Sequence, residues 1–222
     1  MTLKDGSPTM VHPGKPETES LLVVPSWVRG LIFDCDGTLV DTLPLHYTAW
    51  EETFAALGLT CPLDFLIQHN GKPTDQIVAL YNAEFRQSIN VQKFTADKEK
   101  RTYVLLDQSR PLEPVAALAW RHHNRLPMAV VSGSNRPNVE RALQAAGLRE
   151  LFPVTLTADD GLPPKPAPDL FLEAARRLGV EPALCQAFED ADAGLEAIRR
   201  AGMLATDVRP FGGGYTSQAS AC

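Results

Sequence analysis

The pattern of apolar and polar positions changes twice along the chain. A start rich in Pro, Ser, Thr and Gly gives way to a short apolar run at 31–33, which predicts a buried strand over 29–34. Apolar residues then recur at helical spacing, with no strand-like alternation, over 44–57, 61–70, 74–85 and 91–106. From residue 115 onward, segments of helical spacing alternate with short apolar runs, and Gly or Pro separates them.

Alternation of strands and helices in this last part predicts a parallel sheet. The expected strands are 128–131, 154–157, 185–188 and 203–208, and the expected helices are 115–123, 137–146, 169–178 and 193–201. The helical block that follows the first strand is too long for one crossover connection, so we expect it to cover the carboxyl edge of the sheet. The fold class is therefore α/β, a Rossmann-like parallel sheet core with helices on both faces and an inserted all-helical cap domain.

These patterns divide the chain into four parts. The core comprises residues 27–42 and 111–210, and the cap comprises residues 43–110. Residues 1–26 and 211–222 are expected to be flexible tails, because they are poor in apolar residues or rich in glycine.

Composition narrows the class of protein. The 222 residues carry a net charge of -6, which argues against binding to nucleic acid or anionic membranes. The four cysteines show no paired spacing, no segment approaches the roughly 20 apolar residues of a membrane span, and the start lacks the core of a signal peptide. We expect a cytoplasmic, monomeric protein with no nucleic-acid or membrane partner.

Asp34 ends the first strand and Asp36 follows it, with one residue between them, and Gly37 permits a sharp exit from the strand. The carboxyl edge of an open α/β sheet is where ligands bind. There, one carboxylate can act as a covalent nucleophile and the second as general acid and then base. A helix N-cap or turn position is the alternative for either acid.

Two further segments carry candidate phosphate ligands. Ser132 and Gly133 follow the strand at 128–131 and precede a helix, a composition suited to holding an anion, whereas Ser134 and Asn135 better suit helix capping. Lys165 lies in a proline-framed segment before the next helix, where its ammonium can offset the repulsion between a carboxylate and a phosphate. A solvated surface lysine is the equal alternative.

Acidic residues end the strand at 185–188. Glu189 and Asp190 suit a hard cation, Mg²⁺ when a phosphate supplies further ligands, and Asp192 suits either the metal or a helix N-cap. In the expected cap, His46 and Trp50 lie four residues apart on the first helix, and Lys72 lies in a polar turn. These cap residues can face the site or serve as packing and an exposed loop.

The four motifs, in this order and each after a strand, resemble those of the haloacid dehalogenase superfamily of phosphohydrolases. The matching residues are Asp34 and Asp36 in the first motif, Ser132 in the second, Lys165 in the third and Glu189 with Asp190 in the fourth. The position of the cap resembles that of the subfamily with a small helical cap, and the resemblance covers residues 28–209.

The resemblance implies a mechanism. Asp34 would form an aspartyl-phosphate, Asp36 would protonate the departing alcohol and then activate water, and Ser132 and Lys165 would hold the phosphate. Mg²⁺ would be bound by Asp34, the Asp36 carbonyl and Asp190, with Glu189 bound directly or through water.

Within the superfamily, Thr42, His46 and Trp50 match the spacing of β-phosphoglucomutase-like members, which use such residues near the substrate. Other segments, including Asn70 to Thr74, resemble bacterial fructose-1-phosphate phosphatases. The mutase cap carries an Arg where this turn has Lys72 to Thr74, which disfavours mutase activity. The sequence thus predicts a Mg²⁺-dependent phosphatase of small sugar phosphates, with a phosphosugar mutase and a non-catalytic, receiver-like phospho-acceptor as alternatives.

Overall fold

A five-stranded parallel sheet forms the centre of the protein. The computed structural model describes residues 22–214. The strands are β1 (Gly30–Asp34), β2 (Met128–Val131), β3 (Val154–Leu156), β4 (Cys185–Glu189) and β5 (Leu204–Asp207). They lie in the order β3-β2-β1-β4-β5, and every neighbouring pair is parallel. The expected α/β fold is confirmed.

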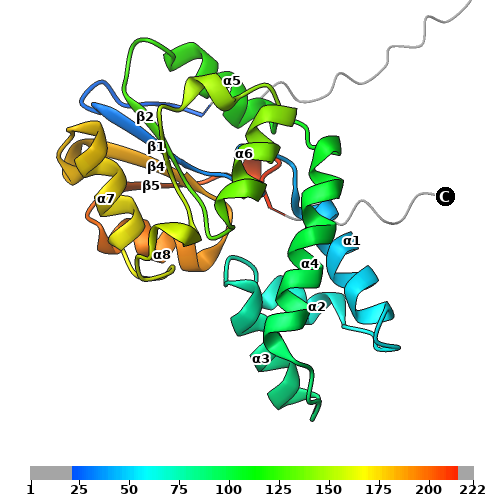
Figure 1. The fold of residues 1–222 in the computed structure, drawn as a ribbon. Helices are drawn as coiled ribbons and strands as arrows, with labels where there is room; N and C mark the ends of the chain where they lie inside the picture. The colour runs from blue at the N-terminus through cyan, green and yellow to red at the C-terminus, as the bar shows by residue number, and fades with distance from the viewer. Residues whose placement is uncertain (1–21, 215–222) are drawn as a thin grey trace, which may run out of the picture.

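Helices cover both faces of this sheet (Figure 1). The core helices are α5 (Glu113–His122), α6 (Arg136–Ala145), α7 (Asp169–Leu178) and α8 (Asp192–Arg200). Apolar residues of α5 and α6 form one buried cluster, and those of α7 and α8 form a second. The strands contribute to both clusters by alternation: Phe33 packs with the first cluster, and Ile32 packs with the second.

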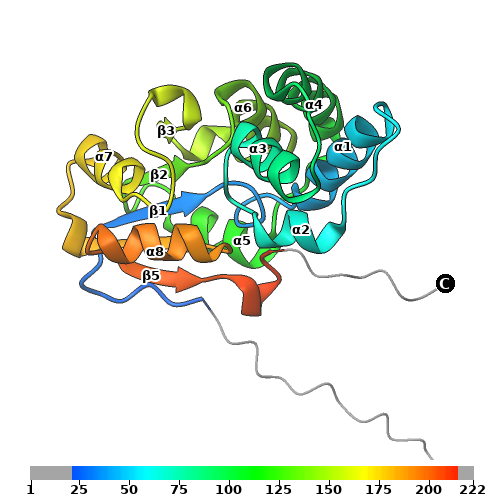
Figure 2. The ribbon, with the colours of Figure 1, turned by 90° about the horizontal axis from the view of Figure 1, so that it is seen from below.

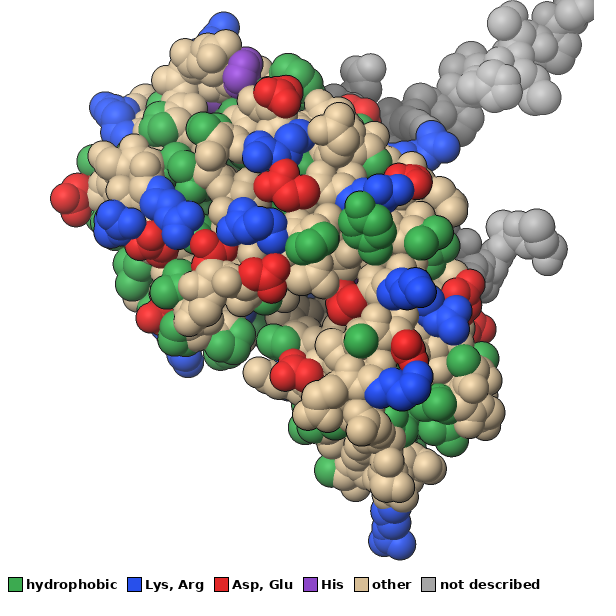
Figure 3. Space-filling view, viewed as in Figure 1, with side chains coloured by type: hydrophobic (Ala, Val, Ile, Leu, Met, Phe, Trp, Pro, Cys, Tyr) green, Lys and Arg blue, Asp and Glu red, His purple; other side chains and the backbone are tan. Residues whose placement is uncertain are grey.

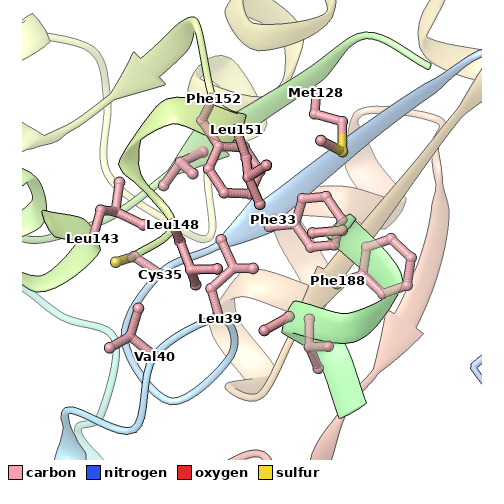
Figure 4. Packing of buried hydrophobic residues seen from close by; sticks show 14 of the residues in the cluster. Phe33, Cys35, Leu39, Val40, Met128, Leu143, Leu148, Leu151, Phe152 and Phe188 are labelled. Carbon is pink, nitrogen blue, oxygen red and sulfur yellow. The ribbon is translucent and has the colours of Figure 1, made fainter. Parts of the chain in front are cut away.

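Aromatic rings fill the first of these clusters. Phe33 stacks on Phe188 with ring centroids 4.7 Å apart and meets Phe152 edge-on at 5.7 Å. Figure 4 shows Cys35 and Leu39 directed into the same cluster, although both lie in the loop that carries the first motif. Apolar packing of Cys35 and Leu39 therefore anchors the loop that follows Asp34 and carries Asp36.

The remaining helices form a separate group beyond the carboxyl edge of the sheet. They are α1 (Leu43–Ala55), α2 (Leu63–Gln68), α3 (Thr74–Glu84) and α4 (Val91–Leu105). The strand arrows in Figure 2 point toward this group. Its own cluster includes Trp50, Phe54, Tyr81 and Phe94, so its packing does not depend on the apolar clusters of the sheet.

Two chain segments connect the helical group to the sheet, and they lie side by side. The Asp41 amide donates to the Arg110 carbonyl at 2.9 Å, and the Leu112 amide donates to the Leu39 carbonyl at 2.8 Å. Val40 forms an isolated antiparallel bridge with Pro111. The two connecting segments, 40–44 and 108–114, thus meet in one short ladder, and we call them the hinge segments.

Element ends differ from expectation by a few residues. The second helix of the group is Leu63–Gln68 rather than 61–70, because Pro62 stands at its N-cap. Helix α5 begins at Glu113 rather than 115, because Pro114 fits the first turn of a helix. Short 3-10 turns, such as Ala158–Asp160 with its capping box, had no periodicity that could predict them.

The two expected tails lie mostly outside the described residues, at 1–21 and 215–222. Within the described part, Leu22 packs into the first core cluster, and the Gln186 side chain donates to the Val23 carbonyl at 3.1 Å. At the other end, the Gly214 amide donates to the Gly37 carbonyl at 2.8 Å. No helix within residues 22–214 is long and apolar enough to cross a membrane.

Candidate active site

Motif residues from three strands converge at one edge of the sheet. Asp34 ends β1, Ser132 follows β2 and Glu189 ends β4. Asp34 is in register with Val131, and Phe33 is in register with Phe188. Because the strands are parallel and the chain leaves β1 for neighbours on both sides, these residues lie at the topological switch point where open α/β sheets bind ligands.

The Lys165 ammonium lies between two buried carboxylates. Its Nζ donates to Asp34 Oδ1 at 2.5 Å and to Glu189 Oε2 at 2.7 Å. Burial alone would lower the pKa of Lys165, but the two carboxylates raise it above its usual value, so the side chain stays charged. Lys165 is 6% exposed, which removes the alternative of a solvated surface lysine.

Asp190 adds a third carboxylate to this cluster. Ligand atoms of Asp34, Glu189 and Asp190 all lie within 4.8 Å of one another. Thr38 Oγ1 donates to Asp190 Oδ1 at 2.9 Å, whereas the buried Asp190 Oδ2 has no hydrogen-bond partner among the described residues. Burial and the nearby Glu189 raise the pKa of Asp190 to about 7, and burial with Glu189 also raises the pKa of Asp34.

This excess of negative charge fits a divalent cation. Three carboxylates lie together with one ammonium, which pairs with two of them, and one oxygen of the third is buried without a donor. An all-oxygen donor set without Cys or His is the set that Mg²⁺ prefers in proteins. The residues present therefore fit a hard divalent ion at the ends of β1 and β4.

Gly194 leaves the space that Glu189 occupies. A Cβ at Gly194 would lie 2.0 Å from Glu189 Oε2. Glu189 Oε1 also accepts from the Ala191 amide at 3.1 Å, and Ala191 is the N-cap of α8. The expectation of Asp192 as an N-cap is therefore wrong: Asp192 is the first residue of the helix, and its exposed carboxylate pairs with Arg209 at 2.9 Å.

Asp36 is held by four side chains. Its Oδ1 accepts from Thr42 Oγ1 at 2.7 Å and lies 3.1 Å from His46 Nε2. Its Oδ2 accepts from Ser132 Oγ at 3.1 Å and from Ser134 Oγ at 2.7 Å. Burial alone would raise the pKa of Asp36, but the His46 imidazole and the hydroxyl donors lower it below its usual value.

A cavity of about 210 Å³ joins this edge to the helical group. Figure 3 shows the surface hollowed where the two parts meet. Asp34, Asp36, Lys165, Glu189 and Asp190 line one side of the cavity, and residues of α1, α3, α4 and the loop 70–73 line the other. The loops approach closely, since a Cβ at Gly133 would lie 3.3 Å from the Gly71 carbonyl oxygen.

The four candidate residues of the helical group occupy different places. His46, Trp50 and Lys72 line the cavity, with Trp50 also packed against Phe94, whereas Thr42 is fully buried against Asp36. The Lys72 ammonium lies 3.2 Å from His69 Nδ1. Thr42 therefore positions Asp36 in this structure, while the other three side chains face the cavity.

Sequence reasoning missed three residues near the site. Ser134, expected as a cap, donates to Asp36, and Asn135 alone caps α6 by accepting from the Asn138 amide at 3.0 Å. Lys98 and Glu99 lie in a charged stretch of α4, a pattern that predicts a helix face exposed to solvent. The available signal for Lys98 was its position four residues after Phe94, on the buried side of the helix.

The sequence model of the haloacid dehalogenase-like hydrolases matches residues 28–202. A fructose-1-phosphate phosphatase of Escherichia coli is 41% identical over 181 residues, which cover 81% of this chain and 96% of that protein.

Solved structures show the same fold. CbbY from Rhodobacter sphaeroides, crystallised with xylulose 1,5-bisphosphate, superposes with a TM-score of 0.73 at 27% identity, covering 80% of this chain and 84% of that chain. A β-phosphoglucomutase from Clostridium difficile gives a TM-score of 0.70 at 26% identity, covering 81% and 84%.

Proposed function

Because the chain belongs to the haloacid dehalogenase-like hydrolase family and is a phosphatase of that family, we propose that it hydrolyses small sugar phosphates, with Mg²⁺, through a phosphorylated Asp34. The observation that carries the proposal is the buried Asp34 carboxylate held at 2.5 Å by the Lys165 ammonium, on the wall of a cavity whose other side is lined by residues of the helical group. The remaining residues take roles that follow from their contacts.

Asp34 is the proposed nucleophile. One of its oxygens forms a bond to phosphorus as the bond from phosphorus to the sugar oxygen breaks. A carboxylate and a phosphate dianion repel each other, and the charged Lys165 beside Asp34 offsets that repulsion.

Asp36 is the proposed general acid and base. In its protonated form it gives a proton to the departing sugar oxygen. The resulting carboxylate then takes a proton from the water that attacks phosphorus, while the bond from phosphorus to the Asp34 oxygen breaks, so that inorganic phosphate leaves and the Asp34 carboxylate is restored. The depressed pKa of Asp36 leaves it ionised before substrate arrives. A phosphate dianion bound nearby raises that pKa by like-charge repulsion, which favours the acid form needed first.

Ser132, Gly133 and Lys165 are the proposed phosphate ligands. The Ser132 hydroxyl donates to Asp36, one of the residues that line the cavity. Gly133 lines the cavity itself, just before the N-terminus of α6. The amides at the start of a helix favour an anion.

Mg²⁺ is the proposed cofactor. Asp34 and Asp190 would bind it with the Asp36 carbonyl, and Glu189, whose oxygens are engaged by Lys165 and the Ala191 amide, would bind it through water. When bound, the ion neutralises charge on the phosphoryl oxygens.

The proposed substrates are small because the cavity is small. Its volume of about 210 Å³ is below the range of roughly 300–1,000 Å³ typical of drug-sized ligands. His46, Trp50 and Lys72 are the proposed contacts to the sugar. We propose that residues 43–110 act as a cap domain that excludes water from the site, supported by their separate apolar cluster and the paired hinge segments.

A phosphosugar mutase is the second candidate, favoured by the structural likeness to a β-phosphoglucomutase. The two candidates differ in their products. A phosphatase releases inorganic phosphate from β-glucose 1-phosphate, whereas a mutase converts it to glucose 6-phosphate with little free phosphate.

The test is phosphate release from fructose 1-phosphate, 6-phosphogluconate, glucose 6-phosphate and β-glucose 1-phosphate. Release is expected to require Mg²⁺ and to vanish in Asp34→Asn. Asp41→Asn is the matched control, because Asp41 is an exposed carboxylate in the adjacent hinge. Activity that survives both chelation and Asp34→Asn would reject the proposal, and a stable acyl-phosphate without turnover would favour the receiver-like alternative.

A further inference from the structure

The Glu99 carboxylate connects the helical group α1–α4 to the core. It lies on α4, yet its Oε2 accepts from two core amides, Asn135 Nδ2 at 2.9 Å and Asn138 Nδ2 at 2.5 Å. Its Oε1 accepts from Thr74 Oγ1 at 2.6 Å and from Lys98 Nζ at 3.2 Å. Each carboxylate oxygen thus accepts two hydrogen bonds, so a substrate hydroxyl could bind Glu99 only by displacing one of them.

The contact between Glu99, whose side chain is 22% exposed, and α6 is partly shielded from water and favoured by charge. Asn138 is 2% exposed. The carboxylate also lies at the N-terminus of α6, where helix amides favour a negative charge. Burial alone would raise the pKa of Glu99, but Lys98 and Thr74 lower it below its usual value, so the side chain is ionised at neutral pH. Hydrogen bonds to an ionised group are stronger than those between neutral groups.

Glu99 also contacts Lys98, which is connected to Asp36 through His46. Lys98 is 3% exposed, and its Nζ lies 3.1 Å from His46 Nδ1. An ammonium can only donate, so Nδ1 accepts and the imidazole proton is on Nε2, which lies 3.1 Å from Asp36 Oδ1. The position of Glu99 therefore bears on the orientation of Asp36 through Lys98 and His46.

We propose that Glu99 is a positioning residue: it latches α1–α4 onto the start of α6 and so holds Asp36 in place through Lys98 and His46. The proposal rests on the proposed function for its kinetic consequence but not for the latch itself. A second contact between α4 and α6 offers a comparison, because Arg141 pairs with Tyr103 and with Asp107 nearer the hinge, where both partners are exposed.

The test compares Glu99→Ala, Asn138→Ala and the double variant with the wild type, and Arg141→Gln is the matched control. Each single variant is expected to lower kcat/KM by roughly tenfold to hundredfold, the range for losing a hydrogen bond to a charged group. The double variant is expected to lose no more than Glu99→Ala alone, because both changes remove the same latch. The loss should be equal for fructose 1-phosphate and glucose 6-phosphate.

Hydrogen exchange without substrate gives a second readout. Amides in the hinge segments 40–44 and 108–114 are expected to exchange faster in Glu99→Ala and Asn138→Ala than in the wild type, whereas those of β1 and all amides of Arg141→Gln are unchanged. If the wild type hydrolyses neither substrate, the proposed function fails while the exchange data still test the latch. Unchanged hinge exchange, additive losses, or a loss confined to one substrate would each overturn the proposal.

Discussion

Gly194→Ala places two effects in opposition at the start of α8. Alanine is a better helix former than glycine by about 1 kcal/mol, so a helix considered alone would be stabilised. In the folded protein, however, the new Cβ would lie 2.0 Å from Glu189 Oε2, 2.1 Å from Cδ and 2.6 Å from Cγ. These separations are far below van der Waals contact, so Glu189 or the helix must move.

The magnitude follows from what that movement disturbs. Overpacking of a buried site costs about 1–3 kcal/mol. If Glu189 also loses Lys165, its partner at 2.7 Å, the cost rises toward the roughly 3–5 kcal/mol of a broken buried ion pair. Because the overlap falls on Oε2, the oxygen that pairs with Lys165, we take the figure for the broken pair; after subtracting the gain in helix propensity, the free energy of unfolding is expected to fall by about 2–4 kcal/mol.

Urea unfolding at pH 7 without divalent cations measures this change. The control is the same substitution in a Glu189→Ala background, which removes all three overlapping atoms. There, Gly194→Ala is expected to be neutral or to stabilise by up to about 1 kcal/mol. Wild-type stability of Gly194→Ala, or an equal loss in both backgrounds, would refute the reasoning.

Three further predictions concern Lys165, Asp160 and two buried cysteines. Lys165→Met leaves Asp34 and Glu189 without their ammonium and is expected to lower the free energy of unfolding by about 3–5 kcal/mol; an unchanged urea midpoint would contradict the pairing. Burial alone would raise the pKa of Asp160, but the Thr157 amide and Arg136 lower it below its usual value. The contribution of ionised Asp160 to the free energy of unfolding is therefore present above the unfolded-state pKa and is lost as pH falls through the folded-state pKa. Asp160→Asn should therefore show a smaller loss of stability than the wild type in urea titrations between neutral and acid pH, and parallel curves would exclude this role. Burial raises the pKa of the Cys35 thiol and, to about 11, that of Cys185, so mass spectrometry should find both unmodified by iodoacetamide until urea is added; alkylation of either in native protein would be inconsistent with the packing.

Local pattern was sufficient to predict the sheet and its carboxyl edge. β2 is an apolar run between Pro127 and Ser132 and has the expected bounds at both ends. Helix α7, which ends before Gly179, also has the expected bounds. Parallel pairing then brings Asp34 and Glu189 to one edge of the sheet, because the strand ends share that edge. Lys165 lies in a loop well beyond β3, so the sequence left its place between the two carboxylates as one of two equal alternatives. The cytoplasmic location and monomeric state stay predictions.

The contacts that tertiary packing creates were not predictable in this way. Lys98 and Glu99 lie in a run of charged residues that is typical of a solvated helix face. Lys98 is nevertheless buried and Glu99 half-buried, because α4 packs against α1 and α6. Ser134 donates to Asp36 instead of capping a helix, because Asn135 already caps α6. Periodicity reports which face of a helix is apolar, but not which polar residue a neighbouring element will cover.

Trapping the phosphoryl group on the enzyme tests the central claim most directly. The protein is mixed with Mg²⁺ and fructose 1-phosphate, quenched in acid during turnover and digested, and its peptides are analysed by mass spectrometry. We predict a phosphoryl group on Asp34, at a level that falls as substrate is exhausted and that is absent without Mg²⁺. Phosphate release without any phosphorylated Asp34 peptide, or a phosphoryl group on another residue that turns over at the rate of product formation, would contradict the account.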